Sequence, residues 1–293
     1  MNIDKVKSYL VLIRPHQWIK NVFILIPAFF AGKIGLLVAN GRLVISVLSF
    51  CAAASSVYVL NDIFDLEKDK IHELKRNRPL ATGAVSVTGA RIVLVLMFGI
   101  ATGLALLVGL TYFYVVAGYF VLNLFYSLYL KHISLIDISL IALGFVLRVL
   151  AGGIAAQVPI SKWLILMTFL LACCLALGKR RDDLLLDIDK QSLRPSLEGY
   201  TLPFIDTSLV VLGVTTIVCY IMYTVSEEVV QRLHSDHIYL TSIFVIIGIL
   251  RFLQIAIVEQ NSGSPTLILL KDTMIQVMIG LWFAAFLVIL YAS

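Results

Sequence analysis

The stretch LVISVLSFCAAASSVYVLNDIFDLEKD, which runs from Leu43 to Asp69, decides the fold class of this chain. Residues 43–61 carry no charged side chain, and about 20 mostly apolar residues are enough for a helix to cross a bilayer. Acidic residues then follow within about two helical turns, beginning with Asp62 and Asp65. The stretch therefore predicts a membrane-spanning helix that ends in an acidic cluster at one face of the membrane.

The composition of the whole chain agrees with a membrane location. Of its 293 residues, 60% are hydrophobic and 14% are charged, whereas a soluble domain carries roughly 25% charged residues. Apolar stretches recur at 21–39, 43–61, 90–110, 112–130, 135–156, 162–178, 207–226, 238–258 and 273–292. We therefore predict an all-α, polytopic membrane protein, a single domain over 1–293 built as a bundle of about nine transmembrane helices.

The distribution of Lys and Arg predicts the orientation in the bilayer, because basic residues accumulate in short cytoplasmic loops. With nine spans and an inside N-terminus, the outer segments hold only Lys33, Arg42, Lys162 and Arg232. We expect a cell (inner or plasma) membrane protein with a cytoplasmic N-terminus and two long cytoplasmic loops, 62–89 and 179–206. Acidic groups gather in these loops, which favours an active site at the cytoplasmic face over a transport pore.

The remaining composition adds two expectations. The net charge of +5 comes from basic residues beside the spans, so we expect the lipid bilayer and no nucleic acid as a partner. Residues 1–20 mix charged and apolar positions without a cleavage site, which predicts an amphipathic interfacial helix and no signal peptide. The four cysteines lie in apolar stretches and are expected to be buried small hydrophobic residues.

The first acidic motif has the spacing of a metal site. Asn61, Asp62, Asp65 and Asp69 share one face of a helix, at separations of three, four, seven and eight residues. Like charges at that spacing repel one another, but Mg²⁺ takes carboxylate oxygens and leaves positions for water and a substrate phosphate. The alternative is a solvated acidic helix start, which is less expected directly after a membrane span.

The second acidic motif is Lys179-Arg180-Arg181-Asp182-Asp183-Leu184-Leu185-Leu186-Asp187. Asp183 and Asp187 are four residues apart and could hold a second Mg²⁺, and the three adjacent bases could clamp phosphates. The alternative is an ordinary cluster of cytoplasmic basic residues with local Arg–Asp pairing.

Other polar side chains lie where the spans end or inside them. Arg78, in a loop shaped by Pro79 and Gly83, is expected to reach a phosphate, and Tyr126 and Lys131 end the fourth span at the same face. Tyr and Lys are also common interfacial anchors, which is the alternative for that pair.

Within or beside the spans, the further candidates are Arg148, Asp137, Arg14, Lys20 and Asn21. Ionisable residues inside a membrane span usually face the bundle interior, and a structural polar network is the alternative to a functional site.

These motifs resemble those of the UbiA superfamily of intramembrane prenyltransferases. The resemblance is carried by Asn61-Asp62-x-x-Asp65-x-x-x-Asp69, by Asp183-x-x-x-Asp187 and by the pair Tyr126 and Lys131, and the helix pattern extends it over nearly the whole chain. A narrower resemblance, to decaprenyl-phosphate phosphoribosyltransferases, is carried by Arg14-Pro15-x-Gln17-Trp18-x-Lys20-Asn21, Arg78-Pro79-x-Ala81-x-Gly83, Tyr126-Ser127-x-x-x-Lys131 and Lys179-Arg180-Arg181-x-Asp183-Leu184. That group is expected to have Glu at position 183, where this chain keeps a carboxylate as Asp.

The narrower resemblance implies a Mg²⁺-dependent transfer of 5-phosphoribose from phosphoribosyl diphosphate to decaprenyl phosphate, or another polyprenyl phosphate, in the synthesis of lipid-linked cell-wall precursors. It implies metal ligands at Asp62, Asp65, Asp69, Asp183 and Asp187, and these aspartates except Asp187 join Tyr126 and Lys131 as catalytic residues. The implied substrate-binding residues are Arg14, Lys20, Asn21, Asn61, Arg78, Arg148, Lys179, Arg180, Arg181 and Asp187. The residues alone leave open a prenyl diphosphate donor with an aromatic or glyceryl-phosphate acceptor, a transporter or lipid scaffold, and assembly as a homo-oligomer.

Overall fold

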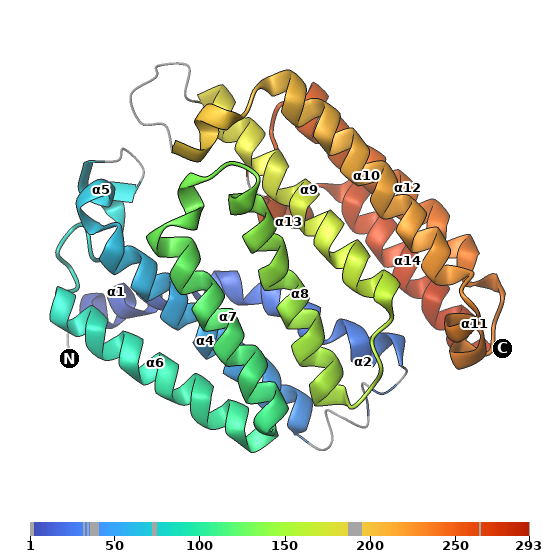
Figure 1. Cartoon of the computed structure of the whole chain (residues 1–293), viewed down its shortest axis with the longest axis horizontal. Coiled ribbons are helices and arrows are strands. Elements are labelled where there is room, and N and C mark those ends of the chain that lie inside the picture. Colours follow the sequence, from blue (N-terminus) through green and yellow to red (C-terminus); the bar gives the residue numbers. More distant parts are fainter. Residues whose placement is uncertain are drawn as a thin grey trace. The chain divides into compact units, whose positions relative to one another are not determined.

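The computed structural model describes residues 3–31, 33, 35, 41–71, 75–186, 195–263 and 265–292, and this part of the chain contains helices and no strand (Figure 1). Seven helical segments are long and apolar enough to cross a membrane: Arg42–Phe64, Val87–Val108, Leu110–Leu128, Ile136–Ala156, Lys162–Leu185, Leu202–Thr224 and His237–Val258. The predicted all-α, multi-spanning fold is confirmed. The count of nine is not, since the described residues give these seven and the shorter apolar helix Thr273–Ile289.

The chain divides into two compact units. The first comprises Met1–Lys131 and Leu147–Pro159, and the second comprises His132–Val146 and Ile160–Ser293. The first contains α1 (Ile3–Ile13), η1 (Pro15–Ile24), α2 (Ile26–Phe30), α4 (Arg42–Phe64), α5 (Leu66–Ile71), η2 (Lys75–Asn77), α6 (Val87–Val108) and α7 (Leu110–Leu128). The short η3 (Leu130–His132) and the long α8 (Ile136–Ala156) contribute to both units.

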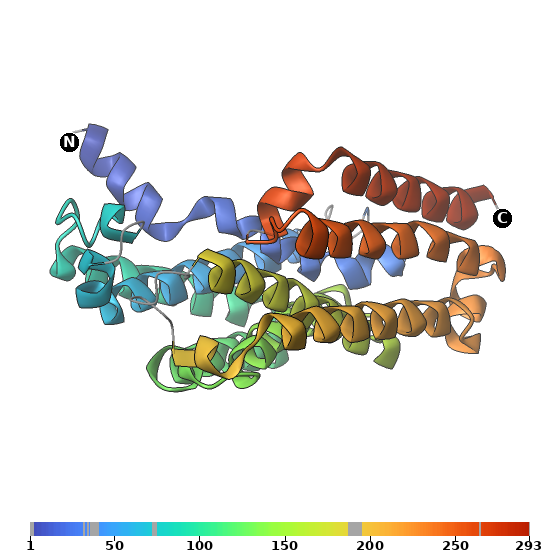
Figure 2. The ribbon, with the colours of Figure 1, turned by 90° about the horizontal axis from the view of Figure 1, so that it is seen from above.

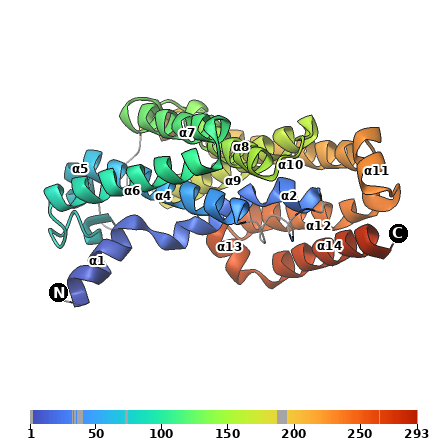
Figure 3. The ribbon, with the colours of Figure 1, turned by 90° about the horizontal axis from the view of Figure 1, so that it is seen from below.

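The second unit holds the rest of the chain. Its elements are α9 (Lys162–Leu186), η4 (Pro195–Gly199), α10 (Leu202–Thr224), α11 (Glu227–Leu233), η5 (His237–Thr241), α12 (Ser242–Leu253), the π-helical η6 (Gln254–Val258), α13 (Pro265–Lys271) and α14 (Thr273–Ala292). Within this unit α9 packs on α10, and α12 lies beside α14 (Figures 2 and 3). Gly178 allows a close approach on α9, because a Cβ there would lie 2.9 Å from the Phe252 ring.

The first predicted span, 21–39, is not one continuous helix in the described residues. The chain forms the 3-10 helix η1 up to Ile24 and then the short helix α2, which has a proline, Pro27, in its first turn. Proline lacks a backbone N–H and is tolerated at the start of a helix but not in its interior. Pro27 therefore fits a new helix start at Ile26 better than a span that began at residue 21.

The two motif-bearing segments, predicted as loops from residues 62 and 179, begin as helix. α4 continues to Phe64 and is followed directly by α5, while α9 continues to Leu186. The acidic residues at 62–69 and 182–183 are therefore displayed on helices that extend the spans. The boundary between the third and fourth predicted spans falls at Gly109, whose φ of 141° separates α6 from α7.

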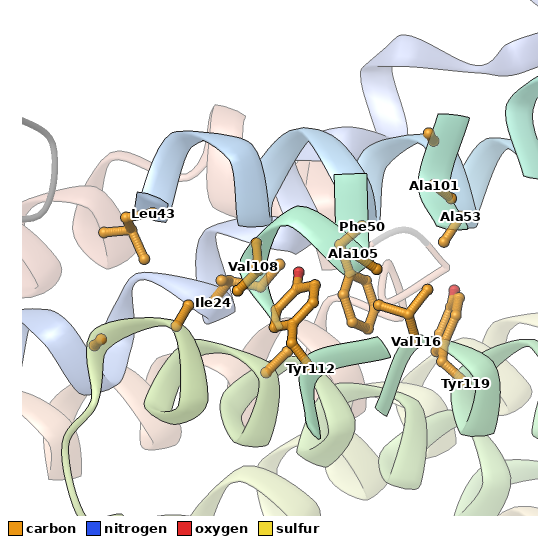
Figure 4. Close-up of a cluster of buried hydrophobic side chains, with 14 of the residues drawn as sticks. Ile24, Leu43, Phe50, Ala53, Ala101, Ala105, Val108, Tyr112, Val116 and Tyr119 are labelled. Atoms are coloured by element: carbon orange, nitrogen blue, oxygen red, sulfur yellow. The ribbon is translucent and has the colours of Figure 1, made fainter. Parts of the chain in front are cut away.

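The core of the first unit lies between α4, α6, α7 and the end of α8. Ala101 and Ala105 on α6 are almost fully buried, and such small residues let neighbouring helices approach closely. Figure 4 shows Phe50 of α4 near Tyr119 of α7, with ring centroids 4.8 Å apart. The Tyr112 hydroxyl, also in this cluster, donates to the Ser46 carbonyl at 2.6 Å. This packing fixes the helix that carries the first acidic motif.

Candidate functional site

The end of α4 carries the first acidic motif in the first unit. The Asp65 amide donates to the Asn61 carbonyl at 2.9 Å, and the Asp69 amide donates to the Asp65 carbonyl at 2.8 Å. Helical bonding thus continues from α4 towards α5, which keeps the motif on one face as the spacing predicts. The exposed fractions of Asp62 and Asp69 are only 1% and 3%. Two carboxylates buried to this degree require positive partners.

Arg78 provides one of these partners. Its Nη1 lies 3.1 Å from Asp62 Oδ1 and 2.5 Å from Asp69 Oδ2, so one nitrogen joins two carboxylates that are seven residues apart. The loop that carries Arg78 is anchored by Leu80 and Val85, which are buried against α4 and α1 in one apolar cluster. The two carboxylates therefore converge on a point that a positive charge occupies.

Ser127, near the end of α7, and Lys131, in the following η3, complete the motif. Lys131 Nζ lies 2.6 Å from Asp65 Oδ1, which brings the predicted lysine to the acidic motif. The Asn61 side-chain oxygen accepts a hydrogen bond from the buried Ser127 hydroxyl. The neighbouring Tyr126 is only half-buried, and no hydrogen bond from its hydroxyl is found among the described residues. Ser127 belongs to a motif that carries the narrower resemblance, but no role in the site was predicted for it from the sequence.

Arg14 reaches the same motif from the N-terminal segment. Its guanidinium forms an ion pair with Asp62 and lies over the Tyr58 ring, 5.2 Å from the ring centroid. The backbone of Arg14 is in the left-handed region, with a φ of 53°. Side-chain-bearing residues rarely adopt this conformation, and they do so mainly where the surrounding contacts enforce it.

Arg148, in the part of α8 that belongs to the first unit, is the centre of a buried polar network. Its Nε donates to the Asn21 side-chain oxygen at 2.8 Å, and its Nη2 donates to the Tyr119 hydroxyl at 3.0 Å. The guanidinium also lies 5.3 Å from the centroid of the Phe50 ring. The Asn21 amide donates in turn to the Cys51 thiol at 3.2 Å. Two predicted residues, Arg148 and Asn21, are thereby brought together.

Lys20 is a third cation in this part of the first unit. It is half-buried and lies outside the seven span-length helices. The pKa of the Lys20 ammonium is lowered to about 8, chiefly by burial and in smaller part by the positive charges of Arg148 and Arg14. The three cations therefore lie close enough to repel one another, which is an arrangement that favours binding of an anion.

The donor set at the end of α4 fits a hard divalent cation. Among the described residues no three acidic, histidine or cysteine side chains already converge as a metal site. The motif aspartates are instead paired with Arg14, Arg78 and Lys131. The oxygens of Asp62 and Asp69 nevertheless meet at one positively charged atom, and carboxylate oxygens are the ligands that Mg²⁺ prefers. Metal binding here requires Arg78 to leave at least one carboxylate.

The second motif, in the second unit, is organised differently. Arg180 is 2% exposed, and its Nε lies 2.7 Å from Asp137 Oδ2 while its Nη1 lies 3.0 Å from Asp183 Oδ2. The Tyr200 hydroxyl donates to Asp137 at 2.9 Å and accepts from the Leu135 amide at 2.7 Å. Burial raises the pKa of the Tyr200 hydroxyl, so the phenol stays protonated as the donor. Arg180 thus joins α9 to the start of α8.

Arg181 and Asp182 also bind neighbouring elements. Arg181 Nε lies 2.6 Å from Asp206 Oδ1 on α10, and its Nη1 has no hydrogen-bond partner among the described residues. Asp182 accepts from the backbone amide of Ser262 at 2.8 Å and from its hydroxyl at 2.9 Å. Lys179 is exposed. The three predicted bases differ in their surroundings, because the two arginines are buried in ion pairs between helices while the lysine is exposed.

Asp137 and Arg148, two ionisable candidates from the same predicted span, belong to separate networks, with Arg180 and Tyr200 around one and Asn21 and Tyr119 around the other. The predicted ligand Asp187 lies outside the described residues. The expectation for the cysteines is confirmed, since all four are buried and free.

The model of the UbiA prenyltransferase family matches residues 22–193, more than half of the chain and both acidic motifs. The chain belongs to the UbiA prenyltransferase family. Together with the apolar helices, this membership makes it a multi-pass membrane protein.

Within the UbiA family, relatives of one kind match over almost the full length. A decaprenyl-phosphate phosphoribosyltransferase of Mycolicibacterium smegmatis is 31% identical, over 98% of this chain and 94% of the relative. That of Corynebacterium glutamicum is also 31% identical, over 92% and 82%. A digeranylgeranylglyceryl phosphate synthase of Sulfurisphaera tokodaii is 30% identical but matches only 51% of this chain.

The UbiA fold is confirmed by solved structures. A UbiA homologue from Archaeoglobus fulgidus bound to DMAPP and Mg²⁺ aligns with a TM-score of 0.72 and 21% identity, over 98% of this chain and all of the other. A UbiA homologue from Aeropyrum pernix aligns with a TM-score of 0.68 and 15% identity, over 92% and 97%.

Proposed function

We propose that this protein transfers 5-phosphoribose from phosphoribosyl diphosphate to a polyprenyl phosphate such as decaprenyl phosphate. An oxygen of the lipid phosphate attacks the anomeric carbon, the bond from that carbon to the diphosphate breaks, and diphosphate leaves. The observation that carries the proposal is the similarity over 98% of the chain to a decaprenyl-phosphate phosphoribosyltransferase. The digeranylgeranylglyceryl phosphate synthase of Sulfurisphaera tokodaii, whose name describes a different reaction, matches only 51% of the chain.

The acidic end of α4 is the proposed binding place of the diphosphate. A Mg²⁺ held by Asp62, Asp65 and Asp69 would neutralise charge that develops on the departing diphosphate. Arg78 and Lys131 are already paired with these aspartates, at 2.5 Å and 2.6 Å, so their charges are available to diphosphate oxygens at the same place. Once such a side chain is released from its carboxylate, its positive charge can stabilise the charge that develops on the diphosphate.

The cations near the N-terminal segment are the proposed binding place of the lipid phosphate. Arg148 is 4% exposed inside a span-length helix, and it is held by neutral Asn21 and Tyr119 together with two aromatic rings. A buried arginine of this kind within a span is a functional candidate, because its charge is expensive to keep there. With Lys20 beside it, this region suits an acceptor that is an anion at membrane depth.

The second candidate function is transfer of a prenyl group to an aromatic or glyceryl-phosphate acceptor. It is favoured by the shared fold with a UbiA homologue bound to DMAPP and Mg²⁺. Both reactions use a diphosphate leaving group, so the residues at the end of α4 suit either donor. The acceptor separates phosphoribosyl transfer from prenyl transfer to an aromatic compound, because the buried Arg148 and the half-buried Lys20 favour a phosphate. The donor separates it from prenyl transfer to a glyceryl phosphate.

A transfer assay tests the proposal. Purified protein is incubated with Mg²⁺, labelled phosphoribosyl diphosphate and a polyprenyl phosphate, and the label is followed into the lipid phase. A parallel reaction offers geranyl diphosphate with an aromatic acceptor. Labelled lipid in the first reaction alone supports phosphoribosyl transfer, and product in the second alone would replace it with prenyl transfer. Replacing Mg²⁺ by Ca²⁺ or a chelator tests the choice of metal.

We also propose that the protein lies in the cell membrane with its N-terminus in the cytoplasm, as the Lys and Arg distribution indicates. A cysteine introduced at the exposed Glu198 reports on this, because the four native cysteines are buried. We expect an impermeant thiol reagent to label it only in inside-out vesicles. Labelling from the outer face of intact cells would reverse the orientation. Glu73, in the other motif-bearing loop, lies outside the described residues.

A further inference from the structure

The segment from Ile13 to Ile24 is fastened to one face of α4. Four side chains of α4 form that face, at spacings of three and four residues: Cys51, Ser55, Tyr58 and Asp62. Three of them contact Asn21 or Arg14, as described above. Ser55 contacts the segment at two further points, and its contacts lie on either side of Arg14.

The Ser55 hydroxyl does not bond within its own helix. Serines inside helices commonly donate back to a carbonyl three or four residues earlier. Ser46 and Ser56 on α4 do this, at 2.8 Å to the Arg42 carbonyl and 2.7 Å to the Ala53 carbonyl. Ser55 instead donates across to the carbonyl of Ile13 at 2.8 Å.

The acceptor side of the same hydroxyl is also used. The Trp18 indole N–H donates to Ser55 Oγ at 2.9 Å. Ile13 is the last residue of α1 and immediately precedes Arg14, while Trp18 lies in η1 four residues after it. One fully buried hydroxyl therefore holds both ends of the turn in which Arg14 has its left-handed backbone.

This arrangement matters because the backbone conformation of Arg14 is unfavourable by itself. A left-handed residue that follows a helix is usually glycine, since any Cβ is strained there. Such a conformation persists when neighbouring contacts determine it. The left-handed backbone of Arg14 directs its side chain so that the guanidinium lies over the Tyr58 ring and pairs with the Asp62 carboxylate.

We propose that Ser55 is a positioning residue that directs the Arg14 guanidinium to the Asp62 carboxylate. The inference rests on the proposed function, in which Arg14 serves the lipid phosphate next to the diphosphate site. Ser55 itself touches no substrate in this scheme. Loss of its hydroxyl frees the turn on both sides, and Arg14 then samples conformations in which its guanidinium no longer lies at Asp62.

The kinetic test compares Ser55→Ala with Ser56→Ala, which removes an equally buried hydroxyl that bonds only within α4. Two lost hydrogen bonds should lower kcat/KM for the polyprenyl phosphate about tenfold in Ser55→Ala. The KM for phosphoribosyl diphosphate should change less. In an Arg14→Ala background the same serine change should have no further effect, because residues that act through one another are not additive. Trp18→Phe, which keeps the ring and loses the N–H, should give a smaller loss of the same kind.

A second measurement needs no substrate. The Gln17 amide donates to the Arg14 carbonyl at 2.9 Å, so its hydrogen exchange reports on the turn. We expect exchange in the peptide covering residues 13–18 to quicken about tenfold in Ser55→Ala and to stay unchanged in Ser56→Ala. Equal behaviour of the two serine variants, or an undiminished kinetic loss in the Arg14→Ala background, would overturn the proposal. If the wild-type protein transfers no phosphoribose, the proposed function fails, and the exchange result alone decides the role of Ser55.

Discussion

The ends of α4 and α9 look alike in sequence and differ in structure. Both follow an apolar span with aspartates at helical spacing and basic residues nearby. At α4 the bases come from other segments, and the side chains of Arg14, Arg78 and Lys131 are 22%, 27% and 18% exposed. At α9 the bases are part of the helix itself, and Arg180 and Arg181 are 2% and 5% exposed.

The difference in exposure suggests that the end of α4 can receive a ligand, whereas the end of α9 is a junction between helices. A partly exposed base can exchange its carboxylate for a substrate phosphate, since solvent already screens part of the ion pair. A fully buried ion pair cannot be opened without leaving an uncompensated charge. We therefore expect the α4 cluster to serve turnover and the buried arginines of α9 to serve stability.

Arg180→Ala should produce the largest effect and should act on stability. The change leaves the buried Asp137 carboxylate with the Tyr200 hydroxyl as its remaining described partner. Breaking a buried pair from one side costs about 3–5 kcal/mol, to be measured as the free energy of unfolding in mild detergent. Arg14→Ala is the comparison, because Asp62 keeps Arg78 and the loss should be smaller. Equal losses in the two variants would remove the distinction between the two helix ends.

Asp65→Asn should produce the next largest effect and should act on turnover. Asp65 is 29% exposed and pairs with Lys131, so the folded protein should lose less than about 1 kcal/mol. A misplaced diphosphate can lower the rate about 100-fold. The initial rate of lipid labelling and the unfolding midpoint are measured on the same preparation. Near-normal rates at saturating Mg²⁺ would exclude Asp65 as a metal ligand.

The fold class and the shared helical face of the first acidic motif could both be predicted from the sequence. Hydropathy located all seven long helices, five of them to within three residues at both ends, because lipid demands continuous apolar helices. Helical spacing predicted that Asp62 and Asp69 share a face, and their common contact with Arg78 confirms it. The first predicted span differed, since hydropathy does not detect that Pro27 and polar contacts break the helix.

The partners of the charged residues could not be predicted from the sequence. Ion pairs such as Arg180 with Asp137, 43 residues apart, depend on how helices pack, whereas the sequence could suggest only local Arg–Asp pairing, of which Arg180 with Asp183 is a case. No role could be predicted for Ser55 or Ser127, because serines are common in buried helices and only their directions distinguish them. The single clue was an excess of serines at 46, 49, 55 and 56 in one apolar span.

Arg78→Ala should separate binding of the metal from binding of the diphosphate. Arg78 pairs with two expected metal ligands, so its removal leaves affinity for Mn²⁺, a probe for Mg²⁺, unchanged or higher. A lost charged hydrogen bond should raise the KM for phosphoribosyl diphosphate about tenfold. Arg76→Ala, in the same loop and exposed, is the control. Mn²⁺ binding that weakens together with substrate binding would instead make Arg78 a support for the carboxylates.

The smallest expected effect is a pH dependence that belongs to Lys20. Its pKa is lowered to about 8, first by burial and then by the charges of Arg148 and Arg14, so the ammonium is lost as the pH rises through 8 instead of near 10.5. A lipid phosphate has its second pKa near 6 and stays doubly charged over this range. If the ammonium binds that phosphate, kcat/KM for the lipid should be constant from about pH 7 to 7.5 and fall about five- to tenfold by pH 9.

Substitutions at Lys20 test whether loss of its proton causes the fall in kcat/KM at high pH. Lys20→Arg keeps its positive charge over the whole range of pH tested and should flatten the profile, while Lys20→Ala should be flat and low. The KM for phosphoribosyl diphosphate should not follow the same curve, because its proposed partners at the end of α4 are other residues. A decline that persists in Lys20→Arg would place the titrating group elsewhere, and the lipid phosphate would then depend on Arg14 and Arg148 alone. That outcome would also weaken the contrast between the ends of α4 and α9. Every cation proposed to bind substrate would then already contact a carboxylate, an amide or an aromatic ring in the ligand-free protein, as the arginines of α9 contact carboxylates.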